Sequence, residues 1–125
     1  PACRAVVTVR DMDKTQLLSF YNSISRCFYS ENKDTTNVET FKILASEAGL
    51  DVDEFVAHYE SDAAKERTRN DFQYAKRLGV TGFPTIVARE NEGKDTKLAL
   101  ISAGYQTYES LVPIIDDWLE NGLRD

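Results

Sequence analysis

Two cysteines and a single histidine are the side chains of this sequence best suited to nucleophilic or metal chemistry. Cys3 and Cys27 do not form a Cys-x-x-Cys pair, the spacing typical of thiol redox sites. Two cysteines in a chain of 125 residues also do not make a disulfide framework. Because His58 has no cluster of cysteines around it in the sequence, no metal site is expected, and no cofactor is indicated. We therefore predict two free, mostly buried thiols.

Each thiol has an alternative role that the sequence leaves open. Cys27 falls within an apolar helical stripe, where a cysteine behaves as a small hydrophobic residue, so core packing is the favoured interpretation. Cys3 lies near a plausible helix start, since Pro1 suits an early helical position, and it is the one candidate for a reactive thiolate. The preferred interpretation of Cys3 is a core thiol at the edge of a helical block. A Cys3–Cys27 disulfide is conceivable, but the spacing gives it no support.

Helical periodicity dominates the chain as far as Leu78. Four capping signals divide it: Asp13 with Gln16, Thr36 with Glu39, Asp51 with Glu54, and Ser61 or Asp62. Apolar residues at helical spacing predict the inward faces: Leu17, Phe20, Tyr21, Ile24, Cys27 and Phe28; Val38, Phe41, Leu44, Ala45 and Ala48; Phe55, Val56 and Tyr59; Phe72, Ala75 and Leu78. His58 has acidic neighbours on its predicted helix, which indicates a surface position, and we assign it no role.

A loop rich in glycine, ending in a proline, joins this helical part to a β-type region. Gly79 stands where a helix C′ residue belongs, because glycine enters the left-handed region without a Cβ penalty. Pro84 precedes an apolar run, and the first position of a strand tolerates a residue that has no N–H. Two β-type runs, 84–89 and 96–101, flank a polar turn that contains glycine, which predicts a hairpin. A terminal helix follows, either beginning near Glu109 or kinked at Pro113.

Composition and charge exclude two classes of partner. The 15 Lys and Arg residues are dispersed and are outnumbered by 21 Asp and Glu, giving a formal net charge of −6. A nucleic-acid surface would need clustered basic residues, so no nucleic-acid partner is expected. No apolar run approaches the roughly 20 residues that span a bilayer, so no membrane association is expected. The chain opens at Pro1 without an initiator Met, which suggests an internal piece of a longer protein.

Three stretches together resemble the DsbA-like thiol–disulfide oxidoreductases. They are Gly-Val-Thr-Gly-Phe-Pro-Thr-Ile at 79–86, Pro-Ala-Cys-Arg-Ala-Val at 1–6 and Ile-Ser-Arg-Cys-Phe-Tyr at 24–29. The match covers nearly the whole chain but only the later two-thirds of the family pattern, and the family's Cys-x-x-Cys segment is missing. The resemblance implies an α/β, incomplete thioredoxin-like fold. Residues 1–79 would form an α-helical insertion block, with its first helix near 1–10 in spite of strong β propensity, and residues 80–125 a ββα half.

The resemblance also implies a substrate site and a function. The Phe83–Pro84 bond is predicted to be cis, and Gly82, Phe83 and Pro84 are predicted to bind a thiol or disulfide peptide or protein as an added β-strand. No catalytic residue is expected in this chain, because its redox cysteine pair would lie upstream, so the piece should be inactive in disulfide exchange. The strand 85–88 would lack one neighbour, and this edge could pair in a homodimer.

Two other functions stay open, a non-catalytic peptide- or protein-binding module and a glutathione-dependent isomerase with a serine-type site. A Cys-x-x-Cys upstream of Pro1 would decide for the oxidoreductase. The compartment favoured by the resemblance is the cytoplasm, with the periplasm as the alternative.

Overall fold

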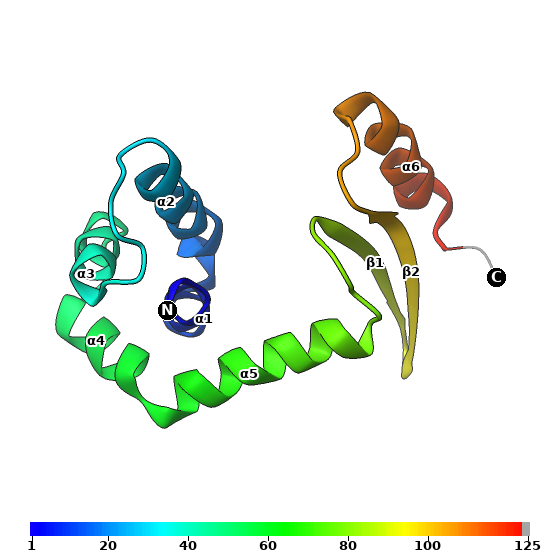
Figure 1. Ribbon diagram of the computed structural model, residues 1–125. Helices are drawn as coiled ribbons and strands as arrows, with labels where there is room; N and C mark the ends of the chain where they lie inside the picture. Colours follow the sequence, from blue (N-terminus) through cyan, green and yellow to red (C-terminus); the bar gives the residue numbers. More distant parts are fainter. Residues whose placement is uncertain (124–125) are drawn as a thin grey trace. The chain divides into compact units, whose positions relative to one another are not determined.

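The computed structural model describes residues 1–123 as two compact units whose boundary falls between Tyr74 and Ala75. The helices are α1 (Ala2–Met12), the short 3₁₀ helix η1 (Lys14–Gln16), α2 (Leu17–Tyr29), α3 (Val38–Glu47), α4 (Val52–Glu60), α5 (Asp62–Arg77) and α6 (Tyr108–Asn121). The strands are β1 (Thr85–Glu92) and β2 (Asp95–Ala103), and Figure 1 shows all of these elements except η1 by label. The boundary between the units therefore lies inside α5. The helix predicted at the start of the chain is confirmed.

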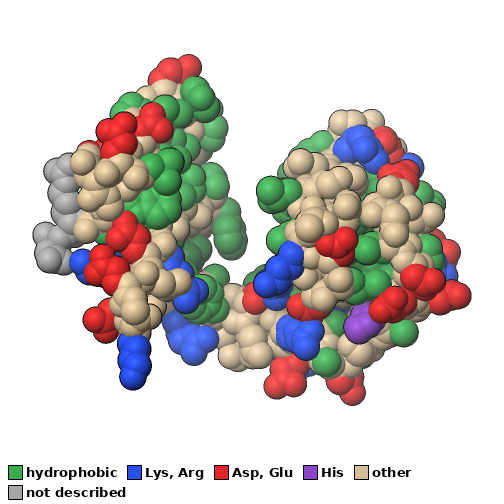
Figure 2. All heavy atoms as spheres, turned by 180° about the vertical axis from the view of Figure 1, so that it is seen from behind, with side chains coloured by type: hydrophobic (Ala, Val, Ile, Leu, Met, Phe, Trp, Pro, Cys, Tyr) green, Lys and Arg blue, Asp and Glu red, His purple; other side chains and the backbone are tan. Residues whose placement is uncertain are grey.

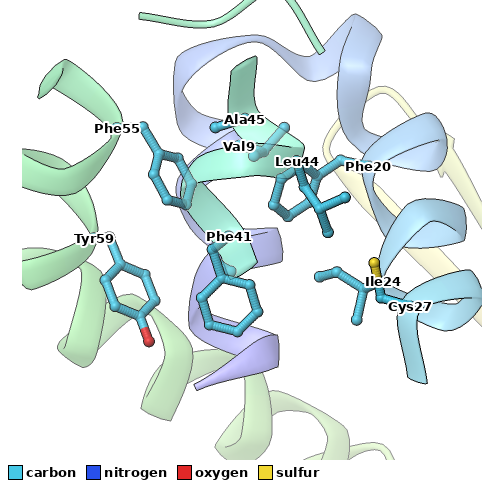
Figure 3. Close-up of a cluster of buried hydrophobic side chains, with 10 residues drawn as sticks. Val9, Phe20, Ile24, Cys27, Phe41, Leu44, Ala45, Phe55 and Tyr59 are labelled. Atoms are coloured by element: carbon cyan, nitrogen blue, oxygen red, sulfur yellow. The ribbon is translucent and has the colours of Figure 1, made fainter. Parts of the chain in front are cut away.

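The core of the first unit is formed by side chains from α1 to α4. Helix α1 contacts both α2 and α4, and α3 contacts α2 and α4, which brings four apolar faces together (Figure 1). The buried cluster consists of Ala5, Val9, Phe20, Ile24, Cys27, Phe41, Leu44, Ala45, Phe55 and Tyr59. Figure 3 shows the aromatic rings of this cluster pointing toward one another from α2, α3 and α4. The predicted inward faces of these three helices are confirmed at these positions.

Some residues that the sequence placed on the inward faces of α2 and α5 are exposed in the structure. Tyr21 and Phe28 lie on the predicted stripe of α2 yet are 55% and 56% exposed, and Phe72 on α5 is 53% exposed. An apolar stripe records which side of a helix is hydrophobic, but burial also needs a neighbouring element on that side. In the described part of the chain these rings are covered only in part. Figure 2 shows hydrophobic side chains reaching the surface of both units.

The helix starts follow the predicted caps in two of four cases. Asp51 accepts a hydrogen bond from the N–H of Glu54 at 2.8 Å, and Ser61 accepts one from Ala64 at 3.1 Å, as predicted. The predicted cap at Thr36 is wrong, because Asn37 is the N-cap of α3 and accepts from the N–H of Glu39. Asp13 caps η1 through Thr15 rather than opening α2 directly.

Helix α5 ends at the predicted glycine. The N–H of Gly79 donates to the carbonyl of Lys76, and the N–H of Val80 donates to the carbonyl of Ala75 at 3.1 Å. This pair of bonds is the Schellman arrangement, which needs a left-handed residue at C′. Gly79 has a φ of +78° and meets that need without a Cβ clash. The turn leads the chain into the loop before β1.

The second unit is an antiparallel hairpin with one helix packed on it. The register pairs Thr85 with Ala103 and Glu92 with Asp95, so the strands run further toward the turn than the sequence predicts. Helix α6 contacts β2. Its capping residue is Thr107, so the helix begins within one residue of Glu109, the first of the two predicted alternatives. Pro113 lies inside the helix, beyond its first turn.

A carboxylate of β1 is hydrogen-bonded to α6 and to the residues after it. Oε1 of Glu90 accepts hydrogen bonds from Nε1 of Trp118 at 2.8 Å and from the N–H of Leu123 at 2.7 Å. Hydrogen bonds to a charged acceptor stabilise more than neutral ones, so this pair holds the end of α6 against β1. Among the described helices, none is long and apolar enough to cross a membrane.

Candidate functional site

The three predicted substrate-binding residues form an exposed loop immediately before β1. The Phe83–Pro84 peptide bond is cis, the form predicted from the sequence. Phe83 is 88% exposed, and its backbone N–H and C=O make no hydrogen bond with any residue that the structure describes. Unpaired backbone groups beside a strand are the usual attachment point for an extended peptide. The loop therefore offers a hydrogen-bonding edge to an incoming chain.

The loop is held on both sides of Phe83 by local hydrogen bonds. The hydroxyl of Thr85 donates to the carbonyl of Gly82 at 2.7 Å, and the N–H of Gly104 donates to the carbonyl of Pro84 at 2.8 Å. These bonds use the carbonyls of Gly82 and Pro84 but leave the backbone of Phe83 open. The role of Thr85 was not predicted, although a threonine directly after the proline is the signal that could have indicated it.

Strand β1 has a paired and an unpaired edge in the described part of the chain. Its only strand neighbour there is β2. One face of the hairpin, with the end of α5 and the following loop, lines a cavity of about 310 Å³. Its side chains include Leu78, Val80, Val87, Leu98 and Leu100. The hairpin therefore carries an open strand edge and an apolar face next to the loop.

The two cysteines lie in the first unit in different environments, and both are free thiols. Cys27 is fully buried in the core, as predicted. Its burial is the main cause that raises the pKa of its thiol, and the nearby carboxylate of Glu31 raises it further. Cys3 is exposed, so its interpretation as a core thiol is wrong. It lies at the surface because α1 turns Ala5 and Val9 toward the core, while Cys3 lines an apolar cavity of about 310 Å³ with Tyr21.

Neither cysteine has the surroundings of a redox pair. A nucleophilic thiol needs a lowered pKa and a partner that can close a disulfide. Burial disfavours the thiolate of Cys27, and Cys3 has no second cysteine beside it in the lining of its cavity. Within residues 1–123, no group of three or more His, Cys, Asp or Glu side chains is placed to hold a metal ion. His58 is exposed, as expected, with Nε2 at 3.8 Å from a carboxylate oxygen of Glu54.

Comparisons with known proteins show which families and structures this chain is similar to. The thioredoxin family model matches residues 12–112, most of the chain. The solved structure of a proposed protein disulfide isomerase from Nitrosomonas europaea superposes with a TM-score of 0.86 and 35% sequence identity, over 96% of this chain and 57% of that one. The ClpXP adapter protein SpxH of Shouchella clausii is 25% identical over 100 residues, 80% of this chain and 33% of that protein.

The matches cover only part of each related protein. The chain spans about a third of the length of the curated relative and just over half of the solved structure. The family match covers far more than half of the chain, and it includes the helices from α2 to α5 and both strands. The predicted thioredoxin-like fold with a helical block, a hairpin and a C-terminal helix is thereby confirmed. The chain belongs to the thioredoxin-fold family of thiol–disulfide oxidoreductases, the DsbA-like group that its sequence resembles.

Proposed function

We propose that this chain is the substrate-binding, C-terminal portion of a thiol–disulfide oxidoreductase. The observation that carries the proposal is the open backbone of Phe83 at the start of β1, next to a strand edge without a neighbour in the described residues. The likeness to a proposed protein disulfide isomerase supports the same chemistry. The substrate would be an extended peptide or protein segment that carries a thiol or a disulfide.

In this proposal, this chain binds the substrate, and a cysteine pair upstream of it carries out the redox step. Phe83 would pair with the backbone of the substrate through its N–H and C=O, with Gly82 and Pro84 at either side. The thiolate of an upstream cysteine pair would attack one sulfur of the substrate disulfide, forming a mixed disulfide and releasing the other sulfur as a thiolate. The second cysteine of that pair would then attack the mixed disulfide and leave the substrate reduced and the pair oxidised. The 125-residue chain alone would bind but not react.

The test compares the chain with a version extended upstream in its reading frame. Insulin reduction with dithiothreitol as the reductant is followed by turbidity. We expect activity from the extended protein that is lost when either upstream cysteine is changed to serine, and background activity from the isolated chain. Cys3→Ser should leave both results unchanged. Activity of the isolated chain that disappears with Cys3→Ser would contradict the proposal and make Cys3 the nucleophile.

A second candidate function is favoured by one comparison. A protein that is 25% identical over 100 residues of this chain is named a ClpXP adapter protein. An adapter of that kind would use the edge beside Phe83 to hold another protein, without disulfide chemistry. The extended protein separates the two functions, because an adapter would bind a peptide at this edge and still show no cysteine-dependent reduction of insulin.

The open edge of β1 supports a proposal about assembly. Isolated hairpins are marginal in water, and an unpaired strand with apolar residues such as Ile86 and Val87 tends to acquire a partner strand. We expect the 125-residue chain to self-associate through this edge into a dimer with a continuous sheet. Sedimentation equilibrium should show a dimer that Val87→Lys shifts toward monomer. A monomer at all concentrations would contradict this assembly.

A further inference from the structure

A hollow on the helical unit is lined by basic side chains and by no carboxylate. It has a volume of about 360 Å³, and its lining consists of Pro1, Arg4, Lys65, Thr68 and Arg69. Three of these five residues carry a positive charge on the side chain. The whole chain has a formal charge of −6, so this concentration of cations is local and opposes the overall charge. All five residues belong to the first compact unit. Pro1 is the N-cap of α1, Arg4 lies in the first turn of α1, and the other three lie in α5.

The guanidinium of Arg4 is held in place from one side. Its Cζ lies 4.0 Å from the centroid of the Tyr59 ring, a cation–π contact with a ring of the buried core. Nε of Arg4 is buried and has no hydrogen-bond partner. A buried donor without a partner is costly, and the cost is larger when the group is charged. The position of Arg4 is thus fixed, while one of its donors still lacks an acceptor.

Two residues of α5 complete the basic lining. Lys65 and Arg69 are four positions apart and therefore lie on one side of the helix. Lys65 has an exposed ion pair with Asp62 at 3.3 Å, whereas the side chain of Arg69 takes part in no ion pair or hydrogen bond among residues 1–123. The hydroxyl of Thr68, which lies between them, is already committed to the carbonyl of Ala64 at 2.7 Å. The donors open to a ligand are therefore those of Arg4, Arg69 and Lys65.

We propose that this hollow, the Arg4–Arg69 site, binds a compact oxyanion, the phosphate or carboxylate group of a small molecule. A guanidinium presents its N–H groups in a planar fork that matches both phosphate and carboxylate oxygens. The lining offers no carboxylate to bind a cation. An oxyanion seated there would give Nε of Arg4 the acceptor that the protein does not supply.

The test is a titration of the 125-residue chain, acetylated at Pro1, so that the charge of its terminal amine does not contribute. Inorganic phosphate and succinate are added separately at constant ionic strength, and the Nε–Hε resonance of Arg4 is followed by NMR. We expect a saturable shift with at least one of the two anions, and the anion that binds more tightly identifies the group. Arg69→Gln should weaken that binding about tenfold or more, because it removes a charge-assisted hydrogen bond.

The matched control is Arg67→Gln, which removes the same charge from the same helix. Arg67 forms an ion pair with Asp11 and lines a different hollow, so its loss should change the affinity by less than about twofold. Arg4→Lys keeps the charge above Tyr59 but loses the fork, and it should also weaken binding. The proposal is overturned if neither anion gives a saturable shift at Arg4, or if Arg67→Gln weakens binding as much as Arg69→Gln.

Discussion

Replacement of Phe20 by alanine is expected to lower the free energy of unfolding of the helical unit by about 3–5 kcal/mol. Phe20 is 1% exposed, and its ring lies 6.1 Å from that of Phe55 in the centre of the buried cluster. Removing the ring loses its transfer free energy and leaves a cavity that the surrounding helices fill only in part. A loss of this size is a large share of the roughly 5–15 kcal/mol that stabilises a typical domain.

The same helix supplies the control for this prediction. Phe28→Ala removes an identical ring from α2, but Phe28 is 56% exposed and has Tyr29 as its aromatic neighbour. We expect it to cost less than about 1 kcal/mol, as is usual for surface substitutions. Urea unfolding followed by far-UV circular dichroism measures both variants. Equal losses for Phe20 and Phe28 would contradict the placement of the core.

The second large effect concerns thiol chemistry. We expect Cys3 to react with a disulfide reagent in the folded protein at least about a hundredfold faster than Cys27, because reaction needs an accessible thiolate. Cys27 is fully buried and its pKa is raised, whereas Cys3 is exposed. Titration of the native protein with Ellman's reagent should give one fast thiol, which Cys3→Ser removes, and a second that appears on unfolding.

The raised pKa of Cys27 also has a consequence for stability at high pH. The unfolded chain would ionise this thiol near its ordinary pKa of about 8.5, before the folded chain does. The protonated thiol of Cys27 therefore contributes fully to stability below that pH, and this contribution is lost as the pH rises through the higher pKa of the folded state. Cys27→Ala should remove this part of the loss of stability at alkaline pH.

In the Ellman titration, fast reaction of both thiols in the native protein would contradict the burial of Cys27.

The sequence predicted the order of helices and strands because its signals are local. The stripe of Phe20, Ile24 and Cys27 has helical spacing, and Gly79 stands at the left-handed position that ends α5. The loop at Gly82, Phe83 and Pro84 was predicted from resemblance, and the structure adds that the backbone of Phe83 is unpaired.

The errors involve contacts between residues far apart in the chain. Phe28 and Phe72 look like core residues by periodicity, but each is more than half exposed. Cys3 is exposed because α1 turns Ala5 and Val9 toward the core instead. The bond between Glu90 and Trp118 joins a strand to the last helix, and no spacing rule predicts such a pair. The same holds for Arg4 above Tyr59, since no pattern in the sequence connects these two residues.

If the backbone of Phe83 holds a disulfide substrate, amide hydrogen exchange at this residue will report the contact. The chain, extended upstream to include its redox pair and with the second cysteine of that pair changed to serine, would hold a substrate peptide as a stable mixed disulfide. Exchange at the Phe83 amide is then compared with and without the trapped peptide. We expect the Phe83 amide to become protected on trapping, while the amides of the hairpin turn at Gly93 and Lys94 do not. An unchanged exchange rate at Phe83 with the peptide bound would contradict this contact.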